Sequence, residues 1–485
     1  MTAQRTTNPT SHSAPAPSGQ RSRELSASLP ATVFERFVLN SEDHAHRMII
    51  RVVLRLTGET DSKALTAAWN EAVIRHPLLM SRISVRDGVP CWVATDPPTL
   101  TVEYAERSIS DIDHGAVGRM PLSEQPGFAG RAIIGDDGLL ITLDVHHACS
   151  DGTGMRQLIA EWMHLYDCRV RGLESQLPPA DPALLQARDE IVQTSGDSKN
   201  SVGGWEGIRN FLLTVRGRTV RPGSRLRAAS GESAQLAAAT CFVEAAVESA
   251  QLLPGVEQAC LRRTLKQFDV TLNDLLLACC MLTVSELWPN ARRSDRITIL
   301  NPVDLRRPSD RFLSACNRFG VVFLRRKFSH CGDPVGLLRG LHDEMTYIKN
   351  KQVAVEFLKG MQQLEKVPGG PGLFRRLGWF VPTLQFTCLG DITRVPSRMF
   401  RTDDRWVYTG HLRFESATGI PPLPPGSPLS VAACLTGPRL TLGVRTSSDV
   451  ISEAETQRIL ATLIGQLQHI CGCLTRDRNS QPAEK

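Results

Sequence analysis

The chain has 485 residues, of which 41% are hydrophobic and 22% are charged, and its formal net charge is +6. These values describe a soluble globular protein of two or three domains and exclude a fibrous or mostly disordered chain. The modest charge allows acidic small molecules as partners and gives no support for nucleic acid binding. Thirteen cysteines are scattered without a CxxC pair, so we expect reduced thiols, a cytoplasmic location and no zinc site.

The two ends of the chain are predicted to be tails. Residues 1–28 are rich in Ser, Thr, Pro and Ala and lack the apolar core of a secretory signal. Residues 476–485 form the second predicted tail. The longest apolar run, Leu275 to Val284, is about half the length that spans a bilayer, so no transmembrane segment is expected, while peripheral membrane contact stays open.

The N-terminal lobe, residues 29–190, is predicted to mix strands and helices. Asp61 is positioned to cap a helix that runs to Arg75, because Pro77 disfavours helical backbone at the residue before it. A second helix with apolar residues at helical spacing follows Gly152. Strands are predicted at Met48–Leu56, Met80–Val85, Cys91–Ala94, Arg131–Ile134 and Leu139–Val145.

The second half shows the same mixture, and no fixed-period repeat is found. Residues 191–235 are predicted to be an interdomain linker that includes a short helix at 205–215, and residues 236–475 a C-terminal lobe. Strands are predicted at Ala239–Val243, Arg296–Leu300, Val321–Leu324, Thr383–Leu389, Leu429–Leu435 and Leu440–Ser447. Helices are predicted at Gly255–Gln267, Thr271–Leu287, Pro334–Leu364 and Glu453–Cys471.

The segment from His146 to Gly152, HHACSDG, lies where a predicted strand meets a predicted helix. A strand period of two places His146 on one face and His147 on the other face or in the turn. Such a corner can present an imidazole to a cleft. Metal binding by both histidines with Asp151 is disfavoured because adjacent strand residues face apart, and a covalent mechanism through Cys149 is disfavoured because residues this close rarely form a Cys–His dyad.

HHACSDG matches HHxxxDG, the signature of the acyltransferase superfamily related to chloramphenicol acetyltransferase. This superfamily includes the condensation domains of peptide synthetases, alcohol acetyltransferases, wax ester synthases and polyketide-associated acyltransferases. Further segments resemble the family: Ala72–Leu79, Val270–Asp274, Pro302–Arg306 and the C-terminal LTLGVRTSSDVISEAE. The resemblance implies a mixed α/β fold of two similar lobes in a V, with the motif near the centre of a tunnel between them.

The resemblance also implies the reaction. An acyl group would move from a thioester donor, coenzyme A or the phosphopantetheine arm of a carrier protein, to a hydroxyl or amine. The donor is a substrate, and no permanently bound cofactor or metal is implied. No thiolation or adenylation module accompanies the motif, so any acyl carrier protein would act in trans. Two alternatives stay open: a stand-alone condensation enzyme forming amides between carrier-bound substrates, and a non-catalytic condensation-like binding module.

The site residues follow from the motif and the resemblance. His147 matches the catalytic histidine and would act as general base. His146 is expected to fix the turn, and Gly152 to leave room at the turn or tunnel. Family members pair the aspartate with an arginine of the other lobe, so Asp151 is expected to meet Arg306, and it can also cap the following helix.

The basic loop after Pro302 leaves two further questions. Asn317 is a weaker candidate for lining the substrate site, and a structural role competes with that prediction. A group of arginines could contact the phosphate groups of coenzyme A or of a carrier arm, although such residues more often form a solvated basic face. The group comprises Arg306, Arg307, Arg311, Arg318, Arg325 and Arg326.

Overall fold

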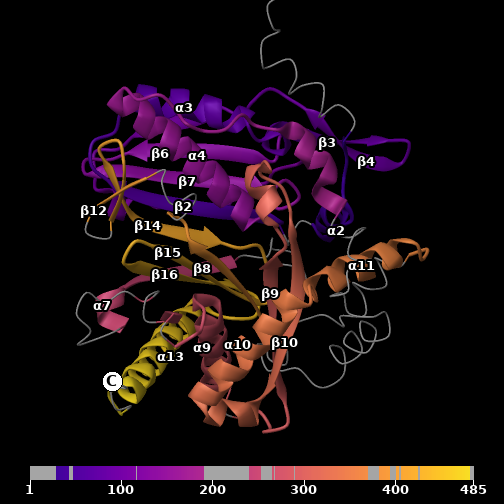
Figure 1. The fold of residues 1–485 in the computed structure, drawn as a ribbon, viewed down its shortest axis with the longest axis vertical. Coiled ribbons are helices and arrows are strands. Elements are labelled where there is room, and N and C mark those ends of the chain that lie inside the picture. Colours follow the sequence, from indigo (N-terminus) through magenta and orange to yellow (C-terminus); the bar gives the residue numbers. More distant parts are fainter. Residues whose placement is uncertain are drawn as a thin grey trace, which may run out of the picture.

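The computed structural model describes residues 29–42, 47–115, 117–190, 240–252, 261, 265–266, 268–288, 290–369, 382–393, 400–403, 406–423 and 427–480. The predicted tail at 1–28, the predicted linker at 191–235 and most of the helix predicted at 255–267 lie outside these ranges. Within them, no helix combines the length and apolar character needed to cross a membrane. The fold is the predicted mixture of helices and strands, arranged in two large sheets and one small one (Figure 1).

The N-terminal lobe is built on a seven-stranded sheet with the order β12-β13-β14-β2-β7-β6-β5. Only β5 and β6 run parallel; the other neighbours are antiparallel. Helices α3 (Ser62–Ile74) and α4 (Gly152–Arg171) pack on this sheet (Figure 1). The strands from the first half of the chain are β2 (Ile49–Thr57), β5 (Leu100–Tyr104), β6 (Phe128–Ile134) and β7 (Gly138–His146).

Trp69 of α3 shows how the helices are seated on this sheet. Its ring stacks on Phe128 at 5.1 Å and meets Trp162 of α4 edge-on at 4.9 Å. All three side chains are buried, and such aromatic contacts add stability beyond the buried area itself. A side chain at Gly130 of β6 would overlap the Trp69 ring, so this glycine is needed for close approach of helix and sheet. The indole N–H donates to the Pro98 carbonyl at 2.7 Å, which satisfies its one polar atom.

The C-terminal lobe is built on a six-stranded sheet with the order β10-β9-β11-β15-β16-β8. Its strands are β8 (Thr240–Glu248), β9 (Arg296–Asp304), β10 (Phe319–Lys327), β11 (Leu384–Asp391), β15 (Leu429–Thr436) and β16 (Arg439–Ser447). Helices α9 (Leu272–Leu287), α10 (Pro334–Asn350) and α13 (Glu453–Ser480) pack together on it (Figure 1).

Short elements complete the fold. A small sheet joins β1 (Leu29–Pro30), β4 (Val89–Ala94) and β3 (Ser81–Arg86). The remaining helices are α2 (Val33–Ser41), α7 (Ser249–Leu252) and α11 (Ala354–Glu365), with 3₁₀ turns at Pro77–Met80, Ile109–Asp111, Pro182–Asp189, Pro308–Phe312 and Phe328–Gly332.

Most predicted elements are present, and the predicted cap of α3 at Asp61 is confirmed. Thr271 caps α9 in the same way. The helix predicted at 334–364 is instead two helices, α10 and α11, separated where Gln352 has a positive φ. Helix α13 continues to Ser480, into the predicted tail. Helix α2 was not predicted, although Thr32 and Glu35 form a capping box at its start.

The largest difference from the prediction is a strand crossing. Residues 236–475 were expected to form one lobe, but β12 (Arg401–Asp403), β13 (Trp406–Thr409) and β14 (Leu412–Ile420) belong to the sheet of the N-terminal lobe. Strand β14 pairs with β2 and also packs against β15 and β16 of the other sheet. The choice of pairing partner is a tertiary property that an isolated strand sequence does not reveal.

Candidate active site

The HHACSDG segment forms the corner where β7 ends and α4 begins. The main-chain N–H groups of His146 and His147 donate to carbonyl groups that precede β6 and β2, at 2.8 and 2.7 Å. At the other end of the corner, Asp151 Oδ1 accepts the N–H of Gly154 at 2.8 Å and caps α4, as predicted. Because backbone hydrogen bonds fix both ends of this turn, the side chains between them have fixed directions.

The imidazole of His146 is turned into the N-terminal lobe and is fully buried. Its Nδ1 accepts the N–H of Ala148 at 3.1 Å, and its Nε2 lies 3.1 Å from a carboxylate oxygen of Glu42. Since Nδ1 accepts, the proton must sit on Nε2 and be donated to the carboxylate. Both ring nitrogens are therefore engaged in holding the turn, which is the contact that the sequence analysis expected of His146.

The imidazole of His147 lies on the wall of a cavity. The ring stacks on Phe319 of β10, with centroids 5.5 Å apart and planes at 14°, and meets Phe34 of α2 edge-on at 5.7 Å. Its Nδ1 lies 3.2 Å from the carbonyl oxygen of Ser150. A carbonyl only accepts hydrogen bonds, so Nδ1 carries the proton and Nε2 keeps its lone pair. This tautomer is the one a general base at Nε2 requires.

Burial lowers the pKa of His147 below its ordinary value of 6.5, and the opposing charge of Asp151 only partly offsets this effect. The lowering favours the uncharged imidazole at neutral pH. A neutral ring can accept a proton from an acceptor group, whereas a charged ring cannot.

Asp151 meets Arg306 across the two lobes. Two nitrogen–oxygen contacts of 2.8 and 2.9 Å join the guanidinium to the carboxylate, and the main-chain N–H of Arg318 adds a third donor at 2.9 Å. Burial alone raises the pKa of Asp151, but Arg306 and the backbone donors outweigh it and hold the pKa below its usual value. The pairing expected from the resemblance is thus present, and Asp151 is directed away from His147's Nδ1, which bonds to Ser150.

Asn317 is not among the residues that line the cavity, and its contacts are of the structural kind that the sequence analysis set beside substrate lining. Its amide nitrogen donates to the carbonyl oxygens of His147 at 2.7 Å and of Ala148 at 2.8 Å. The side chain is 7% exposed. An amide with two donors suits two adjacent carbonyls, so Asn317 ties the C-terminal lobe to the backbone of the motif.

Gly152 and Cys149 occupy tightly packed positions in the same turn. A side chain at Gly152 would overlap Cδ2 of Leu389 from the other lobe, which agrees with the predicted need for space. Cys149 is fully buried, and burial raises the pKa of its thiol well above the usual value. A neutral buried thiol is a poor nucleophile, so the geometry gives no support to a covalent cysteine mechanism.

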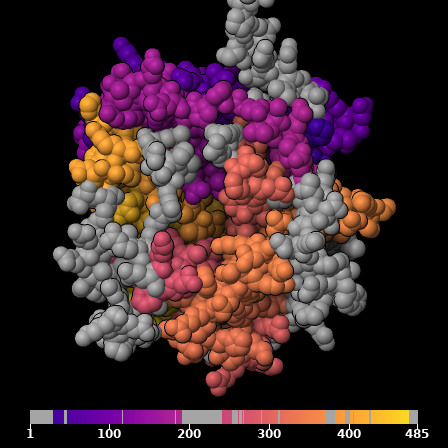
Figure 2. Space-filling view, viewed as in Figure 1, coloured from indigo at the N-terminus to yellow at the C-terminus, as the bar shows by residue number. Residues whose placement is uncertain are grey.

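The arginines after Pro302 are mostly engaged inside the protein. Arg318 lies 3.2 Å from Asp310 and Arg326 lies 2.5 Å from Glu344, while Arg325 donates to Thr298 at 3.3 Å. Arg311 is not among the residues whose side chains the structure describes. Arg325 and Arg326 lie in β10, whereas Arg306 and Arg318 lie in the loop between β9 and β10. Figure 2 shows this salmon-coloured segment against the magenta surface of the N-terminal lobe, and Ser314 of the loop donates to the carbonyl of Arg75 at 2.8 Å.

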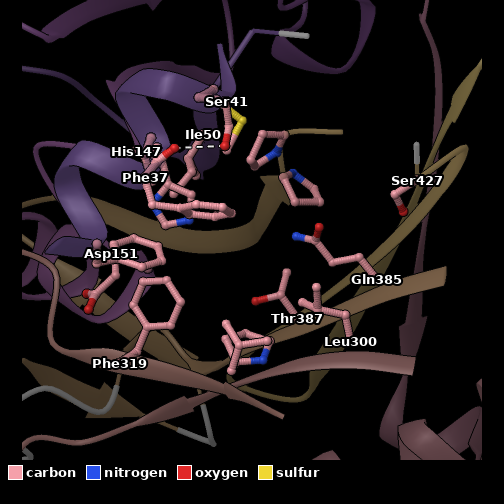
Figure 3. Close-up of a pocket in the computed structure, with 18 of the residues that line it drawn as sticks. Phe37, Ser41, Ile50, His147, Asp151, Leu300, Phe319, Gln385, Thr387 and Ser427 are labelled. Atoms are coloured by element: carbon pink, nitrogen blue, oxygen red, sulfur yellow. Dashed lines mark hydrogen bonds between the residues drawn. The ribbon is translucent and has the colours of Figure 1, made fainter. Parts of the chain in front are cut away.

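The cavity beside His147 has a volume of about 530 Å³ and takes residues from both lobes. Its wall is largely apolar, with five phenylalanines: Phe34, Phe37, Phe319, Phe323 and Phe357. Figure 3 shows Gln385 and Thr387 of β11 on the side opposite His147. Its titratable lining residues include His147, Asp151, Asp304 and Glu365. An apolar cavity with a few polar and titratable groups is the usual form of a small-molecule site.

The sequence analysis did not identify the apolar residues of β10 that line the cavity beside His147. Phe319, Val321 and Phe323 alternate along β10 and all line the cavity. That alternation is visible in the sequence, but it is equally typical of a strand facing a core. Leu389 was also missed, and its one local signal is the glycine that follows it directly after the predicted strand.

Comparisons with known proteins agree with this geometry. Residues 35–188 match the family model described as Condensation domain. A segment of 167 residues is 29% identical to a dimodular nonribosomal peptide synthase of Bacillus subtilis (strain 168), covering 32% of this chain and 7% of that protein. The chain thus spans only a small part of the curated relatives it matches.

Solved structures extend the likeness to the whole fold. The epimerization domain from the third module of tyrocidine synthetase B has a TM-score of 0.59 at 15% identity, with 92% of this chain and 98% of that chain covered. A mutant starter condensation domain of rhizomide synthetase in complex with C8-CoA has a TM-score of 0.62 at 10% identity, with 94% and 97% covered. The predicted resemblance is confirmed by the family match for residues 35–188, and the solved structures show that the fold they share extends over more than nine tenths of the chain.

Proposed function

We propose that this condensation-domain-like chain is an acyltransferase that moves an acyl group from a thioester donor to a hydroxyl or amine, with His147 as general base. The observation that carries the proposal is the tautomer of His147: Nδ1 is held by Ser150, which leaves the lone pair on Nε2, and the ring lines an apolar cavity. The condensation domain family generally transfers acyl or peptidyl groups, which supports the reaction class.

The chemistry requires one proton to be moved twice. Nε2 of His147 accepts the proton of the acceptor hydroxyl or amine as its oxygen or nitrogen attacks the thioester carbonyl carbon. The C–S bond then breaks, and the thiolate takes the proton from the imidazolium as it leaves. General-base action of this kind contributes about 10²–10⁴-fold, so orientation of the two reactants in the cavity must provide much of the remaining acceleration.

The donor is proposed to be a diffusible substrate, either acyl-CoA or an acyl group on the phosphopantetheine arm of a carrier protein in trans. The rhizomide synthetase domain was solved with C8-CoA, which supports the first form. The peptide synthetases among the relatives support the second. If both reactants are carrier-bound amino acyl or peptidyl groups, the chain would be a stand-alone condensation enzyme that forms amides.

Mass spectrometry of the products formed by the purified protein tests the proposal. The protein would be given acyl-CoA or carrier-loaded donors together with mixed alcohols and amines. We expect a new ester or amide, and a loss of about 10²–10⁴-fold in His147→Ala with an unchanged melting temperature. The matched control is His469→Ala, which changes an exposed histidine of α13 that does not line the cavity. Saturable donor binding without product, equal in both variants, would instead identify a non-catalytic binding module.

A further inference from the structure

We propose that the side chain of Leu389 limits the size of the substituents that the reactants can have next to the bond that is formed. The inference rests on the proposed function, because it concerns the same cavity. Three observations support it: a bulge that turns Leu389 out of its strand, two glycines that make room for its side chain, and the position of those glycines next to the catalytic motif.

Leu389 is the extra residue of a β-bulge in β11. Cys388 pairs with Ala433 and Gly390 pairs with Cys434, so Leu389 has no partner position in β15. The bulge is completed by Gly390, whose φ of +68° favours glycine. The carbonyl of Leu389 accepts a hydrogen bond from Arg156 of α4 at 3.3 Å. Bulges of this kind re-aim side chains, and here both Cys388 and Leu389 line the cavity.

The side chain of Leu389 fills space that two glycines leave open. A Cβ atom at Gly152 of α4 would overlap Leu389 Cδ2, and a Cβ atom at Gly419 of β14 would lie 2.6 Å from Leu389 Cδ1. Neither glycine has a left-handed φ, so space, and not backbone conformation, explains why neither carries a side chain. The side chain of Leu389, from the C-terminal lobe, therefore lies between helix α4 and strand β14 of the N-terminal lobe. We call this side chain the wedge.

The Leu389 side chain lies against the turn that carries the motif, because it packs against Gly152. Gly152 follows Asp151 in the motif turn, and both line the same cavity as His147 and Leu389. Leu389 is also partly exposed, as expected for a side chain that faces the cavity. Bulk on the carbon next to the thioester carbonyl, or next to the acceptor atom, would have to occupy the space beside this side chain.

The wedge predicts opposite effects for two substitutions. Leu389→Ala removes three carbon atoms and opens room for branched reactants. Gly419→Ala adds a methyl group that displaces the Leu389 side chain toward the cavity and narrows it. One methylene in an apolar pocket changes selectivity by about 10-fold to 200-fold, so each substitution is expected to shift the ratio of kcat/KM for branched and straight reactants by about tenfold or more.

The test compares straight with 2-branched acyl donors in one arm, and primary with secondary acceptors in the other. We expect Leu389→Ala to raise the branched-to-straight ratio in at least one arm and Gly419→Ala to lower it in the same arm. The double variant should keep the ratio of Leu389→Ala, because the added methyl group then has no leucine side chain to displace. The control variants are Leu389→Met, which conserves volume, and Gly465→Ala in α13, where an added Cβ meets open space. Unchanged ratios in both arms, or additive effects in the double variant, would overturn the proposal.

The same variants separate this inference from the proposed function. If the native protein turns over none of the reactants, binding of straight and 2-branched acyl-pantetheine thioesters is measured by calorimetry. A branched-to-straight affinity ratio that rises in Leu389→Ala and falls in Gly419→Ala supports the wedge while the acyltransferase proposal fails. Turnover with unaltered selectivity in every variant leaves the acyltransferase proposal standing and rejects the wedge.

Discussion

The two walls of the cavity are built in different ways. The wall at the β7–α4 corner is held by polar contacts, in which Asp151, Arg306 and Asn317 join the lobes. The wall formed by β10 and β11 is shaped by apolar side chains such as Phe319 and Leu389. Directional hydrogen bonds can fix the orientation of an imidazole, whereas apolar packing mainly sets the volume that remains. We therefore expect substitutions in the first wall to affect stability and catalysis, and those in the second to affect selectivity.

The largest expected effect comes from breaking the Asp151–Arg306 pair. Their side chains are 7% and 11% exposed, so Arg306→Ala leaves a buried carboxylate without its counter-charge. Removing one partner of a buried pair typically costs about 3–5 kcal/mol, and the free energy of unfolding from urea titration should fall by that order. The control is Arg131→Ala, which removes an ion pair with Glu103 whose side chains are 40% and 43% exposed, and which should cost about 0.2–1 kcal/mol. Equal losses in the two variants would contradict the distinction.

A smaller effect is expected from Asn317→Ala. The substitution leaves the carbonyls of His147 and Ala148 without a donor, at a cost of about 1–3 kcal/mol in the free energy of unfolding. It should also lower kcat/KM, because the backbone that carries His147 loses its anchor to the other lobe. Ser314→Ala is the matched control, since Ser314 in the same loop donates to Arg75 and not to the motif. If both variants retain native kcat/KM, the anchoring role of Asn317 is wrong.

The smallest expected effect is in the pH dependence. The general base must be uncharged, so kcat/KM should rise with pH as His147 loses its proton and level off above that point. Because burial lowers the pKa of His147 from 6.5, the midpoint of this acid limb should lie below 6.5. Burial also lowers the pKa of His76. The stability that comes from keeping both rings neutral is fully present above pH 6.5, the pKa of a histidine in the unfolded chain. It is lost as the pH falls from 6.5 toward the lowered pKa values of the folded state. Melting curves at each pH separate this loss from titration of the base, and an acid limb at or above 6.5 would count against His147.

The sequence predicted the motif corner well because its signals are local. Strand alternation, the Asp151 cap and the helical spacing after Gly152 all lie within a few residues of one another, and they specify the turn directly. The pairing with Arg306 lies 155 positions away in the chain and came only from the resemblance to a family. The roles of Phe34, Phe319 and Leu389 could not be predicted, because an apolar side chain facing a cavity and one facing a core follow the same pattern.

The crossing of β14 has a consequence for how the protein is assembled. Residues 51–57 of β2 pair with a strand that is synthesised more than 350 residues later, since Thr57 pairs with Arg413 and Arg51 with Ile420. Until β14 arrives, the first half of the chain presents β2 as an open edge, and unpaired edges of this kind invite pairing with other chains. The N-terminal lobe is thus not a self-contained folding unit: its sheet is completed only by β14, the same strand that brings Gly419 against Leu389 and so finishes the cavity.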